Sequence, residues 1–578
     1  MLSTHSHGKL LHLTPMDLES TPDAPNQASF ENKTSDSRSE MKHDAVGAVE
    51  QQNLMTEDED ARVYLQGTQF WLVSTSVAVM MFLTNLEVPV VTTALVAITN
   101  DLGSFDNAGW VVASYLLGYV AVIVIFAKFS DIFGRKIIFV LSTALFIIFS
   151  AACSASQTLV QLIVFRAFQG VGGGGCFSLC TILVIELVPP AKYTQFVSNI
   201  SIVNALSLLL GPIIGGAIAS GTSWRWIFII NIPIALPALL ITLSALPKDF
   251  PYHGRLNRQP KSLKFLFSKS TLDRIDFPGT ILVLFATLAL TAGFEEADKQ
   301  FPWRSAYVIT LLTISGLLWI ALVIWERYVT LSSQIREPVL PWRFFKNREM
   351  MGILLNFLFL GGPTLIGMYI IPQRFQLVYG TSGLNAGVKL IPFTITIPFG
   401  AILASTLAGK LKVPALYIVI GGSILQVIGF SLLGTLPSTL YIPPRIYGGE
   451  IIAGLGGGIN FALLFVMIPF VNESRDRAVG MGSGAQFRSM GSSIVLAIST
   501  SVFNTYARPK LQELLGVSSS DDLLFSADAL ASLPPTLLDE VRHVLAEGYN
   551  RQVLVLAVSA ALQVPASLLM WKKKQLVV

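Results

Sequence analysis

The stretch Arg166-Ala-Phe-Gln-Gly-Val-Gly-Gly-Gly174 lies inside an apolar run from 160 to 186, whose other charged residue, Glu186, is at its end. A run of this length exceeds the roughly 20 residues that a helix needs to cross a hydrocarbon core about 30 Å thick. A second stretch of the same pattern, Glu450-Ile-Ile-Ala-Gly-Leu-Gly-Gly-Gly458, follows about 280 residues later. The pair predicts a polytopic membrane protein with two related halves.

Two shorter matches have nearly the same offset. Asn107-Ala-Gly109 corresponds to Asn385-Ala-Gly387, and Ala127-Lys-Phe129 corresponds to Gly409-Lys-Leu411. Internal repeats of this kind are typical of secondary transporters. We therefore expect two six-helix bundles, 70–247 and 350–571, with residues 275–327 inserted between them as an extra helix pair.

The composition excludes an ordinary soluble protein. Of the 578 residues 52% are hydrophobic and only 13% are charged, and the mean hydropathy is +0.61. The charged fraction is about half that of a soluble domain. The polar residues 1–65 contain too little aliphatic material for a core, and we expect them to be a disordered cytoplasmic tail.

Apolar runs bounded by charged, proline or glycine residues predict about fourteen membrane helices, which makes the chain an all-α polytopic protein. They are expected near 70–97, 108–128, 136–154, 160–186, 195–219, 226–246, 277–294, 305–326, 352–374, 384–408, 414–436, 446–471, 480–503 and 551–571.

Lysine and arginine concentrate in alternate loops, which predicts that those loops are cytoplasmic. The basic segments are 248–274, 328–349 and the tail 572–578, together with the short loop that contains Arg135 and Lys136. Both termini are then cytoplasmic. The segment 504–550 falls on the opposite side, where we expect an extracellular loop that forms a small amphipathic lid.

The loop after 108–128 reads AKFSDIFGRK from Ala127 to Lys136. It resembles the signature loop of the major facilitator superfamily, in which Asp131, Gly134, Arg135 and Lys136 match, whereas Ala127 replaces a glycine and Ile132 a basic residue. The resemblance implies the major facilitator fold. A carboxylate here can pair with a charge or a helix end and act as a conformational latch. The alternative is a plain positive loop with a glycine turn.

The run Ser207-Leu-Leu-Leu-Gly211-Pro212-Ile-Ile-Gly215-Gly216 is similar to the antiporter motif of the superfamily. Small residues allow close helix contact and proline favours a kink, so the motif suits a hinge or a tight interface. In the family it accompanies export in exchange for protons. A generic packing face is the alternative.

Three charged residues inside predicted helices are candidates for proton coupling. Glu87 lies in 70–97, where related drug exporters have an aspartate, and Glu450 occupies the position equivalent to Arg166 in the repeat. Buried charges in membranes are costly and mark functional sites. We favour Glu87 as the proton carrier and expect Arg166 to tune a neighbouring acid or to pair with an anionic substrate group, a purely structural role being the alternative.

Polar and aromatic residues of the second half are weaker candidates for substrate binding, because each is more often a packing residue. They are Asn356, Tyr369, Gln373, Asn460, Gln486 and Arg488. Pro341-Trp-Arg-Phe-Phe345 and the segment from Glu295 to Trp303 resemble fungal fourteen-helix toxin and multidrug efflux pumps. The resemblance covers residues 70–571 and implies drug resistance or secondary-metabolite export.

The leading hypothesis is therefore a proton antiporter that exports an amphipathic organic compound, with proton-coupled import of a nutrient or iron chelate as the alternative. A non-transporting membrane sensor is a third hypothesis. No phosphate-binding GxxxxGK[ST] loop and no intramembrane histidine cluster occur, so we expect no enzyme activity, no cofactor and no metal. The expected partners are a small molecule, protons and the lipid bilayer, not nucleic acid. We expect a monomer in the plasma membrane, with a vacuolar or vesicle membrane as the alternative.

Overall fold

The computed structural model describes residues 63–103, 109–251, 253, 268–298, 301–332, 335–515, 530, 533–573 and 575–577. Nearly all of the predicted tail 1–65 therefore lies outside the described residues. So do most of the predicted basic loop 248–274 and the middle of the predicted loop 504–550. Helices dominate the described part, as the sequence predicts.

Six helical segments make up the first bundle. Its long apolar stretches form helices because a backbone in hydrocarbon must satisfy its hydrogen bonds internally. The segments are α2 (Gly67–Leu102), α3 (Gly109–Phe133), α4 (Arg135–Ser154), α5 (Leu159–Glu186), α6 (Tyr193–Gly221) after the turn η2 (Pro190–Lys192), and α7 (Trp226–Ile229) with α8 (Asn231–Ala245).

The second bundle follows an inserted helix pair. The short α10 (Lys269–Leu272) precedes that pair, which is α11 (Phe277–Glu295) and α12 (Ala306–Ser332). The bundle itself comprises α13 (Trp342–Lys346), α14 (Arg348–Gly361), η3 (Gly362–Ile366), α15 (Gly367–Leu377), α16 (Gly383–Lys389), α17 (Ile391–Ser405), η4 (Thr406–Lys410), α18 (Ala415–Gly434), α19 (Arg445–Val471), α20 (Arg477–Leu515) and α23 (Pro535–Leu568).

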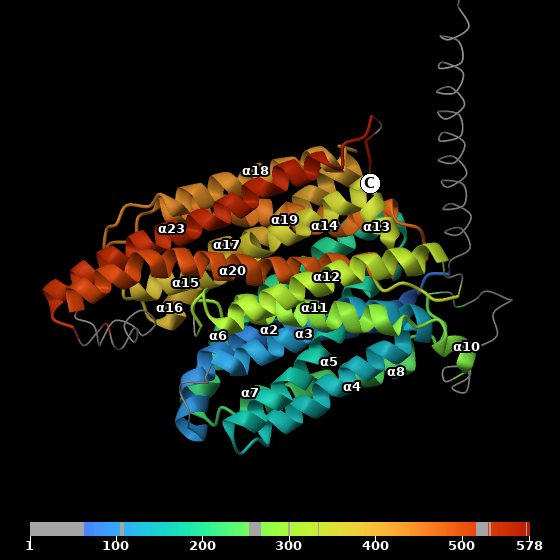
Figure 1. Ribbon diagram of the computed structural model, residues 1–578, viewed down its shortest axis with the longest axis horizontal. Coiled ribbons are helices and arrows are strands. Elements are labelled where there is room, and N and C mark those ends of the chain that lie inside the picture. The colour runs from blue at the N-terminus through green and yellow to red at the C-terminus, as the bar shows by residue number, and fades with distance from the viewer. Residues whose placement is uncertain are drawn as a thin grey trace, which may run out of the picture. The chain divides into compact units, whose positions relative to one another are not determined.

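The two bundles are grouped by sequence in Figure 1, with α2 to α8 together and α14 to α23 together. The inserted helices α11 and α12 pack on each other, and α11 also packs against α3 and α20. Thr287 of α11 accepts a hydrogen bond from Gln486 of α20 at 2.8 Å. The inserted pair therefore lies along the junction of the bundles.

Thirteen helical segments of the described chain are long and apolar enough to cross a membrane. The predicted helix 480–503 exists as α20, but it is not among the thirteen because glycine, serine and charged residues interrupt its apolar sequence. It packs against α14 and α23 of its own bundle, against α3 of the first bundle and against α11 of the inserted pair. Its polar residues are thus largely covered by other helices instead of facing lipid.

Glycines produce the same close helix contact in both bundles. A Cβ on Gly170 or Gly174 of α5 would collide with the backbone of α3 at Tyr115 and Tyr119. A Cβ on Gly454 or Gly458 of α19 would likewise collide with the backbone of α17. The repeated glycine stretch thus has one structural task, to bring two helices into backbone contact.

The loop predicted at 504–550 is shorter than expected, because its flanks are helical. Helix α20 continues to Leu515 and α23 begins at Pro535, so both extend past the predicted ends near 503 and 551. Buried side chains hold the extensions together: the rings of Phe503 and Tyr549 are 5.0 Å apart, and Asn550 donates to the Leu436 carbonyl at 2.8 Å. The predicted helix lengths were based only on the thickness of the membrane. In the structure, contacts between helices stabilise the additional turns of α20 and α23.

Candidate functional site

The residues of the predicted latch form an ion-pair cluster where α3 turns into α4. Gly134 has a φ of 103°, a conformation that favours glycine, and precedes the first residue of α4. Arg135 contacts the Asp131 carboxylate at 2.6 Å. Its other guanidinium nitrogens donate to both oxygens of Glu186 at 2.8 and 2.9 Å. The loop thus joins α3, α4 and α5 through a single guanidinium.

Two lysines connect this loop to other elements. Lys136 donates to the carbonyls of Leu243 and Leu246 at 2.6 Å each, at the end of α8. Lys128 pairs with Glu337 at 2.7 Å. Glu337 lies in the connection between α12 and α13 and was not among the predicted site residues.

Glu337 also pairs with Arg274, at 2.5 Å. Burial by itself would raise the pKa of the Glu337 carboxyl, but Lys128 and Arg274 outweigh burial and hold that pKa below its ordinary value. The carboxylate therefore stays charged at neutral pH. It joins α3 of the first bundle to the segments that flank the inserted pair.

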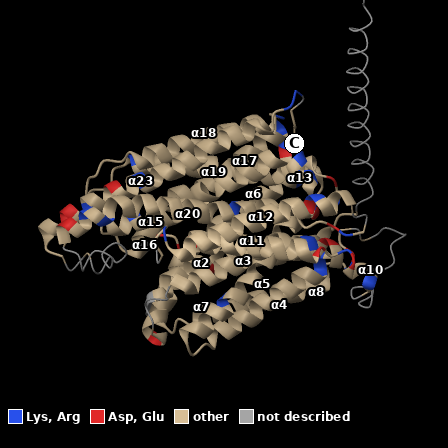
Figure 2. Cartoon of the chain, in the orientation of Figure 1, with Lys and Arg blue, Asp and Glu red and all other residues tan. Residues whose placement is uncertain are grey.

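These ion pairs belong to a charged end of the bundles, which Figure 2 shows near α10, α13 and the C-terminus. Arg343 pairs there with Asp476, just before α20, through contacts of 2.9 and 3.0 Å. Lys572 pairs with Glu349 at 2.7 Å. We use the term charged end below for the end marked by Lys128, Arg135, Glu337, Arg343 and Asp476.

Hydrogen bonds of two side chains, Gln486 and Ser198, join the two bundles toward the charged end. The Val124 amide of α3 donates to Gln486 of α20 at 3.0 Å. Ser198 of α6 contacts the Ala401 carbonyl at 2.9 Å and the Ser405 hydroxyl at 2.8 Å, both at the end of α17. The bundles are therefore closed against each other on this side.

Ala127, which replaces the first glycine of the signature loop, packs against Gly482 of α20. A Cβ on Gly482 of α20 would lie 2.6 Å from the Cβ of Ala127 and 3.4 Å from the Ile123 carbonyl oxygen. Because Gly482 has no side chain, there is room for the methyl group of Ala127. The close contact expected of a glycine at position 127 is kept, with the glycine on the opposite helix.

Glu87 is the centre of a buried polar network in the first bundle. Its side chain, 2% exposed, accepts hydrogen bonds from Arg166 at 2.7 Å, from Gln169 at 2.8 Å and from Asn231. The donors lie on α5 and α8. A charged carboxylate without partners would be costly at this depth, and the three donors offset that cost.

Arg166 is fully buried and joins the same network. It donates to the Val111 carbonyl of α3 at 3.1 Å and to Gln169 at 2.8 Å. The ring of Tyr115 lies 4.3 Å from its guanidinium carbon. An arginine at the centre of a membrane helix costs about 2.5–3.5 kcal/mol on insertion scales, and these contacts compensate it. Arg166 thus lies beside an acid, Glu87, and its tuning of that acid stays a prediction.

Two glycines of the predicted antiporter motif lie against α2. A Cβ on Gly211 would be 2.5 Å from the Cβ of Pro89, and one on Gly215 would collide with Thr93 and Val90. Pro212 lies within α6, which stays helical through it. A Cβ on Gly216 would meet nothing within 4 Å. The motif therefore provides a contact surface for α2 through two of its three glycines.

Similarity to known proteins agrees with this architecture. A model described as Major Facilitator Superfamily matches residues 75–295. MFS-type transporter FPY5 of Fusarium mangiferae is 38% identical over 495 residues, which are 86% of this chain and 82% of that protein. The chain belongs to the major facilitator superfamily.

Other relatives in the superfamily are named as an efflux pump and as a multidrug resistance protein. Efflux pump FUS6 of Gibberella fujikuroi is 30% identical, with 78% of each chain covered. Multidrug resistance protein 3 of Bacillus subtilis is 28% identical over 88% of this chain and 96% of that protein. Among solved structures, the human organic anion transporter MFSD10 has a TM-score of 0.55 at 14% identity and covers 88% of this chain and all of that one. The last likeness concerns the fold alone.

Glu450 differs from the other predicted coupling residues of this superfamily member. It is fully buried on α19, and neither carboxyl oxygen has a hydrogen-bond partner in the part of the chain that the structure describes. Its place in the repeat is that of Arg166, yet the two do not meet. The structure therefore separates the three predicted residues into the Glu87–Arg166 pair and Glu450, whose carboxyl makes no hydrogen bond within the described residues.

The six predicted substrate residues of the superfamily member do not form one cluster. Asn356 bonds to Ser567 at 3.0 Å, and Asn460 bonds to Gln563 at 2.8 Å, both inside the second bundle. Tyr369 and Gln373 are exposed on α15. Only Gln486 and Arg488 lie where the bundles meet.

Two residues of the network, Asn231 and Gln169, were not predicted as site residues from the sequence. Asn231 opens α8 and reaches Glu87 from 144 positions away in the sequence. No local pattern marks it. Gln169 was quoted only as part of a motif, although its position three residues after Arg166 places both side chains on one helix face.

Proposed function

We propose that this transporter exports small amphipathic organic compounds in exchange for protons, by alternating access between its two bundles. The export direction is supported by the relatives named efflux pumps and multidrug resistance protein. Alternating access is supported by the repeat and by the contacts between bundles at the charged end. The proton gradient supplies the energy, about 2.3 kcal/mol per charge per 100 mV of membrane potential.

The proposal of proton coupling rests on the buried ion pair of Glu87 and Arg166, whose charged atoms are 2.7 Å apart. Protonation of Glu87 removes its negative charge and breaks this pair, which leaves Arg166 without an acid. The network joins α2, α5 and α8, so its rearrangement changes the packing of three helices at once. Proton binding on Glu87 can thereby bias the conformation of the first bundle.

Glu450 is a second proton site in this proposal. A buried carboxyl without a partner is much cheaper in its neutral form than as an anion. Loading and unloading of Glu450 would accompany its exposure to water as the bundles move. Glu87 remains the preferred carrier because its protonation alters contacts between helices.

The positive-inside rule favours a cytoplasmic location for the charged end and for both termini. The conformation closed at this end is then closed to the cytoplasm. We place the protein in the plasma membrane as a monomer, with a vacuolar or vesicle membrane as the alternative location.

Uptake into inverted membrane vesicles tests the proposal. With an acidic lumen, vesicles with the wild-type protein should accumulate fluorescent amphipathic drugs, and Glu87→Gln should reduce gradient-driven uptake at least tenfold. Glu450→Gln should reduce it less. Glu473→Gln, which removes an exposed carboxylate at the charged end, is the matched control and should leave uptake unchanged.

The outcomes separate the parts of the proposal. Gradient-driven uptake that persists in Glu87→Gln and disappears in Glu450→Gln would move the proton site to Glu450. Uptake that persists in both would retain antiport and exclude both carboxyls as carriers. Proton-driven accumulation only in right-side-out vesicles would replace export by import.

A further inference from the structure

Arg488 of α20 is a buried cation that has no ion pair with an acid in the described part of the chain. Its exposed fraction is 8%, and within the described residues its guanidinium makes neither a hydrogen bond nor an ion pair. Arg166, by contrast, pairs with Glu87, and Arg374 donates to Asn550 at 2.7 Å. Arg488 thus has an unused set of donors.

Two aromatic rings hold the guanidinium, one from each bundle. Its carbon lies 5.0 Å from the ring centroid of Phe461 on α19 and 5.7 Å from that of Phe177 on α5. These distances fit cation–π contact. Arg488 is 11 residues from the first residue of α20, Arg477, which is about 16 Å along a helix and so near the middle of a core about 30 Å thick.

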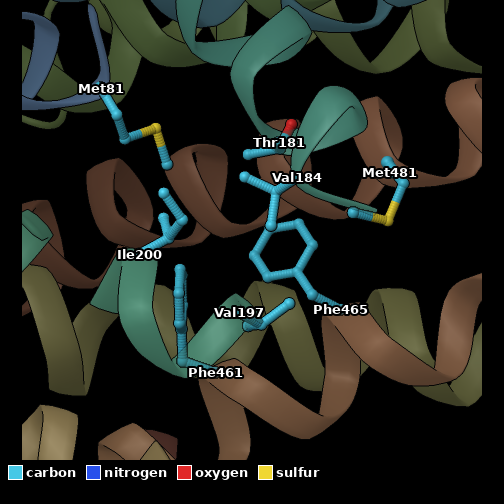
Figure 3. Close-up of a pocket in the computed structure, with 8 residues that line it drawn as sticks. All are labelled: Met81, Thr181, Val184, Val197, Ile200, Phe461, Phe465 and Met481. Carbon is cyan, nitrogen blue, oxygen red and sulfur yellow. The ribbon is translucent and has the colours of Figure 1, made fainter. Parts of the chain in front are cut away.

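An apolar pocket adjoins this cation at the junction of the bundles. Figure 3 shows its lining residues, which come from α2, α5, α6, α19 and α20: Met81, Thr181, Val184, Val197, Ile200, Phe461, Phe465 and Met481. Thr181 carries the only hydroxyl among them. Phe461 belongs to both features, because it lines the pocket and also contacts Arg488.

A tyrosine of α3 lies near Arg488. The ring of Tyr119 is 5.6 Å from that of Phe177, and Tyr119 is close enough to Arg488 for the two groups to interact electrostatically. In the described part of the chain the Tyr119 hydroxyl makes no hydrogen bond. A cation and a hydroxyl thus lie near each other, and the cation contacts Phe461, which lines the apolar pocket.

We infer that Arg488 binds the anionic group of the transported compound, which makes the substrates amphipathic organic acids with an aromatic or aliphatic body. This inference rests on the proposed transport function and specifies its substrate class. The guanidinium offers a carboxylate two parallel donors. The pocket beside Phe461 is small in this conformation, and its apolar side chains would contact the apolar body once the two bundles move apart. The rings of Phe177 and Phe461 stabilise the cation with which the substrate would pair.

Equilibrium binding to the purified transporter in lipid nanodiscs tests this assignment with one probe pair, 1-pyrenebutyrate and its neutral amide, at neutral pH. The wild-type protein should bind the acid at least tenfold more tightly than the amide. Arg488→Gln should lower affinity for the acid at least tenfold and affinity for the amide less than twofold. Arg488→Lys keeps the charge and should retain a preference for the acid.

Arg551→Gln is the matched control. It removes a guanidinium that stacks on an aromatic ring, Tyr506 at 4.0 Å, but that lies outside the pocket. This variant should bind both probes as the wild type does. A monodisperse elution profile of each variant establishes folding before binding is measured.

Equal affinity of the wild type for acid and amide would overturn the substrate class, as would unchanged acid binding by Arg488→Gln. Either result is distinct from failure of the proposed function, because gradient-driven uptake of neutral drugs would continue. Conversely, acid binding that depends on Arg488 in a protein without gradient-driven transport would retain the site and overturn proton-coupled export.

Discussion

Glu87 and Arg166 each depend on the other for their burial. The carboxylate has three donors from α5 and α8, and the guanidinium has an acid, an amide and a backbone carbonyl. Removing one member of a buried ion pair leaves an uncompensated charge, at a cost of about 3–5 kcal/mol. Removing both leaves neutral groups and costs less.

We therefore predict a non-additive pattern in a double-mutant cycle. Arg166→Gln should lower the apparent Tm of the purified transporter more than the double variant Glu87→Gln, Arg166→Gln does. The measurement is thermal unfolding in detergent, followed by tryptophan fluorescence. Additive losses in the cycle would mean that the two side chains contribute independently and would contradict the pair as the unit of stability.

At the scale of the helix, the contact between α2 and α6 depends on two glycines. Gly215 lies against Val90 and Thr93, whereas its neighbour Gly216 faces open space. We predict that Gly215→Ala destabilises the transporter by about 1–3 kcal/mol because a methyl group would overlap with α2. Gly216→Ala should change stability by less than about 0.5 kcal/mol.

Comparison of the two alanine variants in chemical unfolding checks this prediction. They differ by one position and carry the same side chain, so helix propensity affects both similarly. Equal stability of the two proteins would show that α2 and α6 can separate without cost, and the motif would then not be a tight interface.

At the scale of the whole molecule, the charged end closes through the contact of Ala127 with Gly482 and through the ion pairs around it. We predict that Gly482→Leu prevents this closure, because the larger side chain cannot fit against α3. Spin labels on Lys192→Cys and Arg475→Cys, one from each bundle, should then report a longer distance than in the parent protein.

The native cysteines Cys153, Cys176 and Cys180 are buried and leave these labels selective. Gly421→Leu provides the control, since a Cβ there meets nothing within 4 Å. It should leave the distance distribution unchanged. An unaltered distribution in Gly482→Leu would show that the charged end closes without close packing at Ala127.

Hydrophobic run length and the repeat determined the fold class, the inserted pair and the two bundles, because a helix in lipid is dictated locally by apolar length and backbone hydrogen bonding. They also marked Glu87 and Arg166, since a charge inside an apolar run is visible without coordinates. The predicted ends near 503 and 551 were wrong. Contacts such as that of Phe503 with Tyr549 allow α20 and α23 to be longer than the membrane thickness requires.

Only the tertiary structure decided which of these charges have partners. Asn231 reaches Glu87, Glu337 reaches Lys128 and Phe177 reaches Arg488 across long sequence separations. It also placed Glu450 apart from Glu87 and Arg166, the other two residues predicted for proton coupling. The physical reason is that burial and pairing depend on which helix faces meet, and the apolar pattern of a membrane helix, similar on all its faces, does not specify that.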